Sequence, residues 1–414
     1  MLKFLRRASL LLLLAAGTLV QAGEGPPPKG TLVIIGGGLR PDNDAVWQRI
    51  VDLAGGKGAR IAVFGSASAA PEWAGNRDAA RFKAAGANAF VVPVAVKLQG
   101  TDYRAMADNP QWADAVRNSG GAFFAGGDQS RITQALRHAD GSNTLVLDAL
   151  WDLYRRGGVI SGTSAGAAIM STTMFDKPKS VLATLKTGVA DGDEISSGLG
   201  FIGDDVFVDQ HLLVRGRFAR MIPVMLKKGY KIGLGIDENT AMIIWPDREV
   251  EIVGYRGAML VDLSQATTER GTFNITNARL SYLDAGDRYN MKTKAFMPGP
   301  EKRDGKLDPA NPYYREPLFS ADILGNSTVV DLMSKLIDST QTDAIGLTLG
   351  SPLSIQPDIG FEFRLSRTRD SVGYLSASTE SSSVYNIRLD VRPIQILLPM
   401  YQYKELQEKA PTPP

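Results

Sequence analysis

Residues 159–167 read Val-Ile-Ser-Gly-Thr-Ser-Ala-Gly-Ala, an apolar run that leads into a serine between small residues. The spacing fits Gly-x-Ser-x-Gly, with a predicted strand before the serine and a run compatible with a helix after it. A sharp strand-to-helix turn lifts the serine hydroxyl out of a sheet, and small neighbours let a substrate carbonyl approach. The stretch therefore predicts that Ser164 is a nucleophile. The alternative is a Gly- and Ser-rich connection without catalytic consequence.

Apolar runs and helical patterns alternate along the chain around this segment. Strands are predicted at residues 31–35, 59–64, 89–94, 121–124 and 159–161, and helices at 45–53, 77–85, 112–118, 130–137 and 145–156. Such alternation implies an α/β fold, in which a mainly parallel sheet has helices on both faces. From about residue 235 short strands follow one another directly, beginning with 241–245, 249–253 and 258–261. We therefore expect a catalytic α/β domain over residues 31–270 and a β-rich C-terminal extension over residues 271–414.

The first 22 residues have the organisation of a secretory signal peptide. Three basic residues precede an apolar stretch over residues 10–20, and Val-Gln-Ala at 20–22 supplies the small residues that signal peptidase favours. A retained membrane anchor is the alternative, although the apolar run is well short of the roughly 20 residues that span a bilayer. Residues 23–30 are predicted to be a linker. The mature chain is expected in the periplasm or outside the cell, without membrane contact after cleavage near Ala22.

Charge and cysteine content exclude several classes of function. The chain has 46 basic and 44 acidic residues, and three of the basic residues but no acidic one lie in the signal peptide, so the formal net charge of +2 becomes −1 on cleavage. That charge gives no reason to expect nucleic-acid binding. The absence of cysteine excludes thiol catalysis and cysteine-ligated metals. Gly36, Gly37 and Gly38 lack Gly-x-Gly-x-x-Gly spacing, so a dinucleotide is not expected, nor is any other cofactor or metal.

A serine nucleophile needs a base, and the chain contains two histidines. His138 follows a predicted helix, where the negative end of the helix dipole stabilises a charged imidazole. His211 follows an apolar strand at 206–210, and sites in open α/β folds lie at the carboxyl edge of the parallel sheet. His211 is therefore the predicted base. Asp237 and Glu238, which follow another strand, are both candidates for the acid that orients it.

Acyl transfer also needs N–H donors for an oxyanion. The N–H of Ala165 would face it, because this residue follows the nucleophile and begins a helix. A second donor is expected from the glycine-containing strand end at residues 123–129, which precedes a helix. Arg215, Arg217 and Arg220 follow the predicted base. Guanidinium groups there suggest carboxylate recognition by paired hydrogen bonds, and a solvated helix start is the alternative.

These segments together resemble the S51 serine peptidase family, and within it the cyanophycinases rather than the shorter aspartyl dipeptidases. The matching stretches are residues 36–38, 123–129, 162–167, 209–211 with the three arginines, and 235–240. They occur in the order that the family has, between about residues 30 and 290. The resemblance implies a class I glutamine amidotransferase-like fold with serine in place of the usual cysteine, and it suggests a homodimer.

The resemblance also implies a role for each candidate residue. The triad that the resemblance implies is Ser164 as nucleophile, His211 as base and Glu238, favoured over Asp237, as the third member. The implied donors to the oxyanion are the N–H groups of Ala165 and of either Gly127 or Asp128. The residues implied to line the substrate pocket are Gln129, Thr163, Asp209 and Gln210. Those implied to face substrate carboxylates are Arg215, Arg217 and Arg220.

The substrate that the resemblance implies is multi-L-arginyl-poly-L-aspartate, which has an aspartate backbone and arginine on its side chains. Cyanophycinases hydrolyse this polymer to β-Asp-Arg dipeptides. We therefore expect an exported serine peptidase that cleaves it through an acyl-enzyme on Ser164. Two alternatives stay open: a peptidase or amidase of the same fold that acts on aspartyl peptides, and a non-catalytic binding protein.

Overall fold

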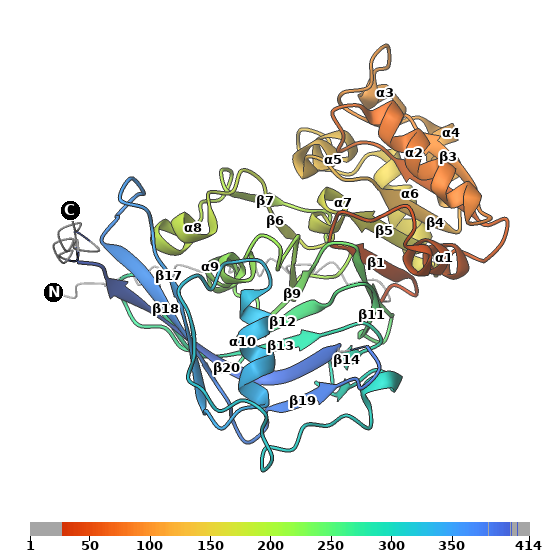
Figure 1. The fold of residues 1–414 in the computed structure, drawn as a ribbon. Coiled ribbons are helices and arrows are strands. Elements are labelled where there is room, and N and C mark those ends of the chain that lie inside the picture. The colour runs from red at the N-terminus through yellow and green to blue at the C-terminus, as the bar shows by residue number, and fades with distance from the viewer. Residues whose placement is uncertain (1–26, 380, 398, 400–403, 405–414) are drawn as a thin grey trace, which may run out of the picture.

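A computed structural model of the 414-residue chain describes residues 27–379, 381–397, 399 and 404. The predicted signal peptide and the first half of the predicted linker lie outside these residues. Within the described ranges, the strands form two nine-stranded sheets and a two-stranded ribbon (Figure 1). Across the same ranges, no helix has the length and apolar character needed to cross a bilayer.

The first sheet has a parallel half and an antiparallel half. The parallel half contains, in order, β1 (Thr31–Ile35), β5 (Val159–Thr163), β4 (Gly121–Phe124), β2 (Arg60–Phe64) and β3 (Asn88–Val92). The antiparallel half, on the other side of β1, contains β10 (Thr240–Ile244), β11 (Glu249–Gly254), β14 (Arg288–Asn290) and β15 (Phe296–Met297). Because β1 and β5 are parallel neighbours, their carboxyl ends meet at one edge of the sheet.

Helices cover both faces of the parallel half, because its side chains alternate between two cores. In β1, Leu32 and Ile34 pack on one face, and Val33 and Ile35 pack on the other. The helices on the Val33 face are α1 (Asp44–Leu53) and α2 (Pro71–Ala84). Those on the Leu32 face are α3 (Tyr103–Ala107), α4 (Pro110–Arg117), α5 (Gln129–Leu136), α6 (Leu145–Arg155) and α7 (Ala165–Ala168). The predicted α/β arrangement is confirmed.

The second sheet contains most of the C-terminal strands. Its order is β16 (Leu318–Ser320), β17 (Asp343–Thr348), β18 (Ile359–Ser366), β20 (Ser382–Gln395), β13 (Ile275–Leu283), β12 (Ala258–Asp262), β9 (Ile232–Ile236) and β8 (Val206–Gln210), with β19 (Val372–Leu375) beside β20. The helices α9 (Phe218–Lys228) and α10 (Thr328–Ile337) pack on one face of this sheet. The predicted strand-rich C-terminal segment is confirmed.

The partners of β8 and β9 differ from the sequence-based expectation. The sequence pattern predicts that residues 206–210 end at the edge of the parallel sheet, but β8 pairs with β9, and β9 pairs with β12 in the second sheet. Apolar patterning reports local burial, whereas the choice of neighbouring strand depends on contacts distant in the chain. β12 also pairs with β13, beyond residue 270. One hydrogen-bonded sheet therefore contains strands from both sides of the predicted domain boundary.

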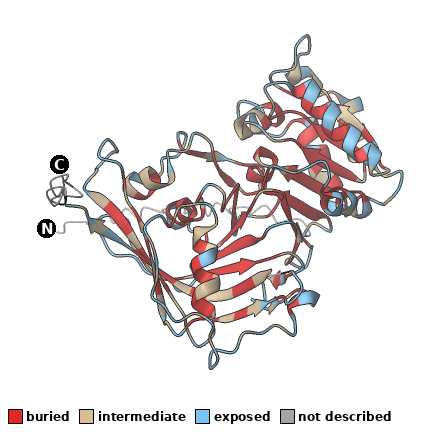
Figure 2. Ribbon diagram, in the orientation of Figure 1, coloured by how far each residue is buried: buried red, intermediate tan, exposed pale blue. Residues whose placement is uncertain are grey.

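One apolar core joins the two sheets. It contains Met242 and Ile244 of β10 together with Val208 of β8 and Leu234 and Ile236 of β9, all of them buried. Figure 2 shows buried residues along the strands of both sheets. The carboxyl ends of β5, β8 and β9 are therefore held in fixed relative positions, which a site assembled from three strands requires.

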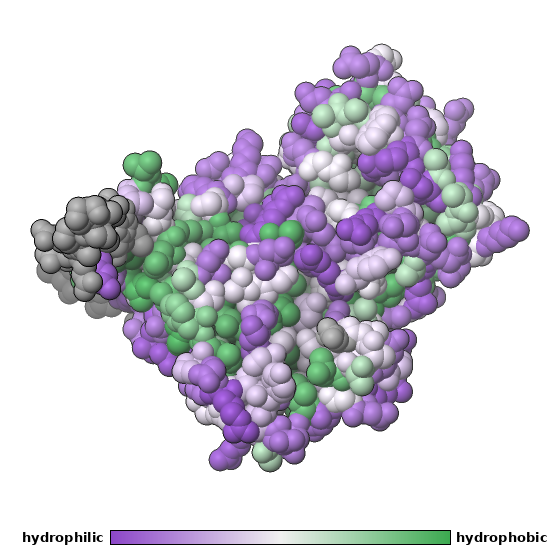
Figure 3. All heavy atoms as spheres, in the orientation of Figure 1, coloured by the Kyte–Doolittle hydropathy of each residue, from purple (hydrophilic) through white to green (hydrophobic). Residues whose placement is uncertain are grey.

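The surface becomes more apolar towards the C-terminal sheet. Figure 3 shows hydrophobic residues gathered beside β17 and β18, whereas hydrophilic residues dominate over the helices of the first sheet. Leu353 and Ile355, in the β17–β18 connection, are exposed. The Lys186 amino group of α8 (Val181–Thr187) donates to the Ile355 carbonyl at 2.9 Å and holds this connection against the helix. Next to α8 lies the ribbon of β6 (Thr173–Phe175) and β7 (Ile195–Ser197).

Candidate active site

Ser164 lies in the turn between β5 and α7. Its φ of 55° and ψ of −108° form a backbone conformation that few residues other than glycine adopt. Packing excludes side chains at the two neighbouring glycines: a Cβ on Gly162 would lie 2.3 Å from the Gly166 carbonyl oxygen, and one on Gly166 would lie 2.4 Å from the Phe124 carbonyl oxygen. The tight turn that the Gly-x-Ser-x-Gly pattern predicts is therefore present.

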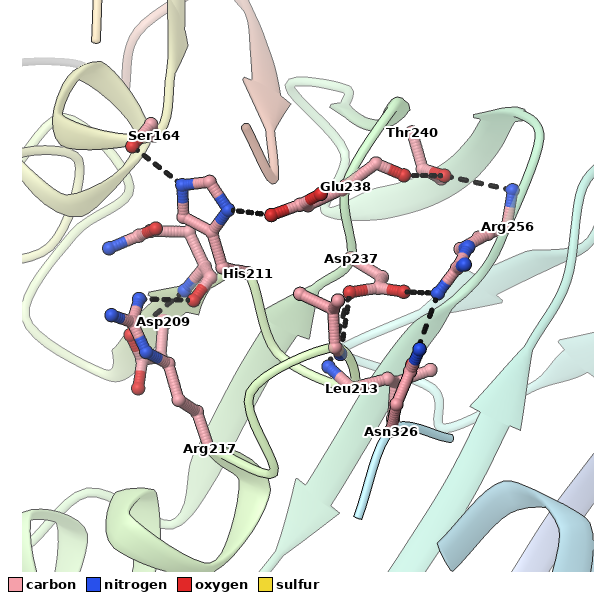
Figure 4. A network of polar contacts seen from close by, with 12 residues as sticks. Ser164, Asp209, His211, Leu213, Arg217, Asp237, Glu238, Thr240, Arg256 and Asn326 are labelled. Atoms are coloured by element: carbon pink, nitrogen blue, oxygen red, sulfur yellow. Dashed lines mark hydrogen bonds and ion pairs between the residues drawn. The ribbon is translucent and has the colours of Figure 1, made fainter. Parts of the chain in front are cut away.

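His211 and Glu238 lie beside Ser164, although the strands that precede them, β8 and β9, belong to the other sheet (Figure 4). Ser164 Oγ and His211 Nε2 are 2.8 Å apart, and His211 Nδ1 and Glu238 Oε1 are 2.5 Å apart. The Glu238 carboxylate can only accept from Nδ1, which leaves Nε2 to accept the serine proton. The three side chains thus form a nucleophile–base–acid series.

Asp237, the other candidate for the acid, does not contact the base. Its buried carboxylate accepts hydrogen bonds from the N–H groups of Leu213 and Val214, both at 3.2 Å, and from the Arg256 guanidinium at 2.9 Å. Both carboxylate oxygens are therefore occupied within the protein. The geometry selects Glu238, the residue that the family resemblance favoured.

The environment of His211 suits it to act as a base. Burial lowers the pKa of His211 below the ordinary value of 6.5. The hydrogen bond to Glu238 opposes this shift, and the positive charges of Arg215 and Arg217 add to it. The imidazole is therefore neutral at neutral pH, which is the form that can take a proton from serine.

Three consecutive carbonyl groups, at the last residue of β1 and the two residues after it, accept hydrogen bonds from the backbone at or next to each member of the triad. The pairs are Ser164 N–H to the Ile35 carbonyl at 3.0 Å, His211 N–H to the Gly36 carbonyl at 2.8 Å, and Asn239 N–H to the Gly37 carbonyl at 2.8 Å. Asn239 directly follows the acid in the chain. One short segment therefore sets the positions of the nucleophile, the base and the acid, which come from two different sheets.

Gly37 and Gly38 also leave the space that the triad needs. Both have positive φ, and a Cβ on Gly37 would lie 2.2 Å from His211 Cε1, while one on Gly38 would lie 3.1 Å from Glu238 Oε2. The role of these glycines in the triad was not predicted from the sequence. The sequence feature that could have indicated this role is the run of three glycines after a buried strand. Such a run indicates positive φ or a close approach by another group.

Two backbone N–H groups beside Ser164 are available for an oxyanion. Within the part of the chain that the structure describes, the N–H groups of Ala165 and Gly127 make no hydrogen bond. The N–H of Asp128, by contrast, donates to the Ala67 carbonyl at 2.9 Å. Of the two alternatives for the second donor, the geometry therefore favours Gly127, because the Asp128 N–H is already used.

Comparison with known proteins shows to which family this site belongs. The family model of Peptidase family S51 matches residues 32–252. The chain belongs to peptidase family S51. It is therefore a serine peptidase, as the triad geometry indicates.

Relatives of this S51 peptidase include two cyanophycinases. The one from Geminocystis herdmanii is 31% identical over 281 residues, which cover 66% of this chain and 97% of the relative. The one from Trichormus variabilis is 27% identical over 279 residues, which cover 65% of this chain and 88% of the relative. Among solved structures, that of a peptidase from an acI-B1 Actinobacterium is 20% identical with a TM-score of 0.44, over 56% of this chain and 91% of that chain.

Two hollows meet at the nucleophile of this S51 peptidase. The Arg215 hollow has a volume of about 420 Å³, and its lining includes Gln129, Asp176, Gln210, Arg215, Arg217 and Arg220. The Asp78 hollow has a volume of about 510 Å³, and its lining includes Trp73, Arg77, Asp78, Arg81 and Thr163. Gly127, Ser164 and His211 line both. A substrate carbonyl at Ser164 therefore has space on two sides.

Two of the predicted substrate-binding residues pair with each other. Arg220 donates to both carboxylate oxygens of Asp209, at 2.7 and 2.8 Å, and both side chains are almost fully buried. The Arg220 guanidinium carbon also lies 4.0 Å from the Phe175 ring centroid. This pairing uses both carboxylate oxygens of Asp209, whereas Arg220 also lines the Arg215 hollow, and direct substrate binding by these two residues stays a prediction. Their bidentate pair holds α9 against β8 and fixes the wall of the Arg215 hollow.

Arg215 and Arg217 are the arginines with hydrogen-bonding capacity left for a substrate. Arg215 is exposed, and its side chain makes no hydrogen bond or ion pair with other described residues. Arg217 donates to the Gln210 carbonyl at 2.9 Å. Burial and the neighbouring Arg220 lower the pKa of Arg217 to about 10, so its guanidinium stays charged at neutral pH. Two cations therefore face the Arg215 hollow.

The remaining predicted pocket residues also line the hollows. The Gln129 amide donates to the Phe175 carbonyl at 2.5 Å, which leaves the amide oxygen of Gln129 unused. The Thr163 hydroxyl and the Gln210 side-chain oxygen are buried, and neither has a partner among the described residues. Such atoms beside a nucleophile are candidates for substrate contacts. His138 lines neither hollow, and its Nε2 lies 3.5 Å from an Asp108 carboxylate oxygen.

Proposed function

We propose that this S51 peptidase hydrolyses cyanophycin, multi-L-arginyl-poly-L-aspartate, to β-Asp-Arg dipeptides. The observation that carries the proposal is the placement of Arg215 and Arg217 beside the complete Ser164–His211–Glu238 series. Each unit of the polymer has a free carboxylate on its arginine, and guanidinium groups bind carboxylates with paired, charge-assisted hydrogen bonds. The cyanophycinases among the relatives add independent support.

The proposed mechanism is acyl transfer through Ser164. His211 takes the serine proton as Oγ attacks a backbone carbonyl carbon between two aspartate units. The N–H groups of Ala165 and Gly127 donate to the oxyanion. His211 then protonates the leaving nitrogen, the C–N bond breaks, and an ester on Ser164 remains. A water molecule that gives its proton to His211 hydrolyses this ester and releases the second product.

The Arg215 hollow also holds an acid for the guanidinium of the bound unit. Asp176 lines the hollow, and burial raises its pKa. A bound cation favours the ionised carboxylate, so the guanidinium of a substrate unit and Asp176 would stabilise each other. Asp128 also lines the hollow, but its carboxylate lies 3.6 Å from the Arg131 guanidinium. Arg215, Arg217 and Asp176 thus offer two cations for the carboxylate of a unit and an acid for its guanidinium.

The test compares substrates with the purified chain lacking residues 1–22. Cyanophycin and a panel of α-aspartyl dipeptides are incubated with the protein, and the products are identified by mass. We expect dipeptides of aspartate and arginine from the polymer and little cleavage of the α-aspartyl dipeptides. Cleavage of the dipeptides alone would favour the second candidate, an aspartyl peptidase. Polymer that is bound but left intact would favour a non-catalytic binding protein.

We also propose that the chain is exported and cleaved after Ala22. The support is the basic start, apolar stretch and small residues of the segment 1–22. The full chain is expressed in a Gram-negative host, and the first residue of the protein from the periplasm and the medium is determined. We expect Gly23, whereas an intact N-terminus in the cytoplasm would contradict export. The predicted homodimer is tested on the same material by its mass in solution.

A further inference from the structure

The Asp78 hollow is the second of the two spaces that meet at Ser164. A carbonyl at the nucleophile has the acyl part of the substrate on one side and the amine part on the other. If one unit of the polymer lies in the Arg215 hollow, the adjoining unit extends into the other space beside the nucleophile. The Asp78 hollow should then match the charges of a β-Asp-Arg unit, one guanidinium and one carboxylate.

The helix α2 already holds a guanidinium in this hollow. The guanidinium carbon of Arg77 lies 4.8 Å from the Trp73 ring centroid, and Arg77 Nη2 lies 2.7 Å from Asp78 Oδ1. An aromatic ring and a carboxylate together form a binding place for a guanidinium. The Arg77 side chain is 45% exposed, whereas that of Asp78 is 3% exposed. The exposed Arg77 side chain can therefore move away from the Trp73 ring, whereas the buried Asp78 carboxylate stays beside it.

Asp78 has hydrogen-bonding capacity that Arg77 does not use. Arg77 reaches Oδ1 through both Nε and Nη2, and Oδ2 is buried without a partner among the residues that the structure describes. Buried polar atoms without a partner are uncommon. Burial raises the pKa of Asp78 despite the nearby arginines, which means that their charges do not fully compensate the loss of water. A guanidinium that met both oxygens would satisfy this carboxylate.

Arg81 supplies a cation for the opposite charge of the unit. It lies one helical turn beyond Arg77, on the same face of α2, and lines the same hollow. Its side chain is exposed and has no ion-pair partner within the described ranges. The Asp78 hollow therefore offers an acid and an aromatic ring for a guanidinium, and a free cation for a carboxylate.

We propose that the Asp78 hollow is a subsite for the β-Asp-Arg unit that adjoins the unit in the Arg215 hollow, an inference that rests on the proposed function. The guanidinium of this unit stacks on Trp73 and binds Asp78, in the place that Arg77 occupies without substrate. Its carboxylate binds Arg77 and Arg81. Each charge keeps a partner during this exchange, because Arg77 loses one carboxylate and gains another.

The test uses oligomers of β-Asp-Arg in which one arginine at a time is replaced by citrulline, its neutral analogue. The ratio kcat/KM is measured for the wild type, for Asp78→Asn and for a control, Asp331→Asn, which removes an exposed acid paired with Lys335 on α10. In the wild type, citrulline at the unit in this subsite should lower kcat/KM about tenfold or more, because a charge-assisted hydrogen bond is lost. For D78N, kcat/KM should already be lower by that factor on the oligomer with arginine at this unit, and citrulline should lower it no further. D331N should behave as the wild type.

The outcomes separate the subsite from the proposed function. If D78N prefers arginine over citrulline at every unit as strongly as the wild type does, the subsite is excluded. This holds even if D78N is slower on all oligomers, because a purely structural role of Asp78 would affect all oligomers alike. If the wild type cleaves none of the oligomers, the proposed function fails instead.

Thermal unfolding of D78N shows whether this buried substitution prevents folding. If it does, a second variant tests the subsite. Arg81→Gln changes an exposed residue on the same helix. Replacing arginine by agmatine, which lacks the carboxylate, at the unit in this subsite should lower kcat/KM about tenfold in the wild type and by a clearly smaller factor in R81Q, which keeps only Arg77 for the carboxylate. Equal discrimination by the two proteins would count against the subsite.

Discussion

The carboxylate of Asp237 accepts a hydrogen bond from the guanidinium of Arg256, with 2.9 Å between Oδ2 and Nη1. The other oxygen of Asp237 accepts hydrogen bonds from the N–H groups of Leu213 and Val214, which lie in the loop after His211. Figure 4 shows this network beside the triad. The acid that does not touch the base thus fixes the backbone of the loop that carries Arg215 and Arg217.

The C-terminal segment takes part in the same network. Asn326 accepts from Arg256 at 3.4 Å, and the Ser327 N–H donates to the Leu213 carbonyl at 3.3 Å. A Cβ on Gly216 would lie 2.1 Å from the Leu324 carbonyl oxygen, so the loop and this segment are in close contact. The S51 family match ends at residue 252. A part of the chain outside that match therefore supports the wall of the Arg215 hollow.

The substitution Arg256→Gln should weaken substrate binding more than it slows the chemistry. It leaves one oxygen of the buried Asp237 without its charged partner, which should lower the free energy of unfolding by about 1–3 kcal/mol and loosen the loop. We expect KM to rise several-fold with a smaller change in kcat. Arg288→Gln is the matched control, because Arg288 is similarly exposed and pairs with acids away from the site. An unchanged KM in R256Q would show that the network does not position the loop.

The substitution Gly37→Ala should reduce activity out of proportion to stability. Its Cβ would overlap the His211 ring, and displacement of a catalytic group by about 1 Å lowers the rate about 10²-fold. Gly141→Ala is the control, because Gly141 also has positive φ but has open space around its Cβ position. The unfolding temperature should fall in both variants, since both strain the backbone, and somewhat more in G37A, because its Cβ also displaces the His211 ring. Equal activity in the two variants would contradict a positioning role for Gly37.

The pH dependence of kcat/KM should report His211. Only the neutral imidazole takes the serine proton, so activity rises as the pH increases through the pKa of His211. Burial lowers that pKa, which places the acid limb below about 6.5. The charge of Arg215 contributes to the lowering, so Arg215→Gln should move the limb to higher pH while it raises KM. A limb above 6.5 in the wild type, or a shift to lower pH in R215Q, would not fit this environment.

The two histidines should differ sharply in their effect on turnover. His211→Ala removes the base and should lower kcat by about 10⁴-fold or more. His138→Ala should leave kcat within about twofold, since surface substitutions away from a site have small effects. Steady-state rates on cyanophycin measure both variants. A large loss of activity in H138A at unchanged stability would mean that the base has been assigned incorrectly.

The parts of the site that the sequence predicted are those with few alternatives. Ser164 lies in a turn whose glycines are required by local packing, and His211 is one of two histidines in the chain. The choice between Asp237 and Glu238 could not be made from the pattern alone. It depends on how the chain turns after β9, and the hydrogen bond between Asn239 and Gly37 helps to set that turn.

The parts that the sequence did not predict depend on contacts between distant segments. The membership of β8 and β9 in the second sheet follows from their pairing with each other and with β12. The bidentate pair of Asp209 and Arg220 forms only after β8 and α9 pack together. A charged residue near a site can serve the substrate or another side chain, and spacing does not distinguish these two roles.

The proposed activity is the depolymerisation of cyanophycin through Ser164. The most direct measurement is the mass analysis of soluble products released from cyanophycin by the wild type and by Ser164→Ala, with thermal unfolding as evidence that both are folded. We expect β-Asp-Arg dipeptides from the wild type and none from S164A at equal stability. Equal release by S164A, or release of free arginine in place of the dipeptide, would contradict it.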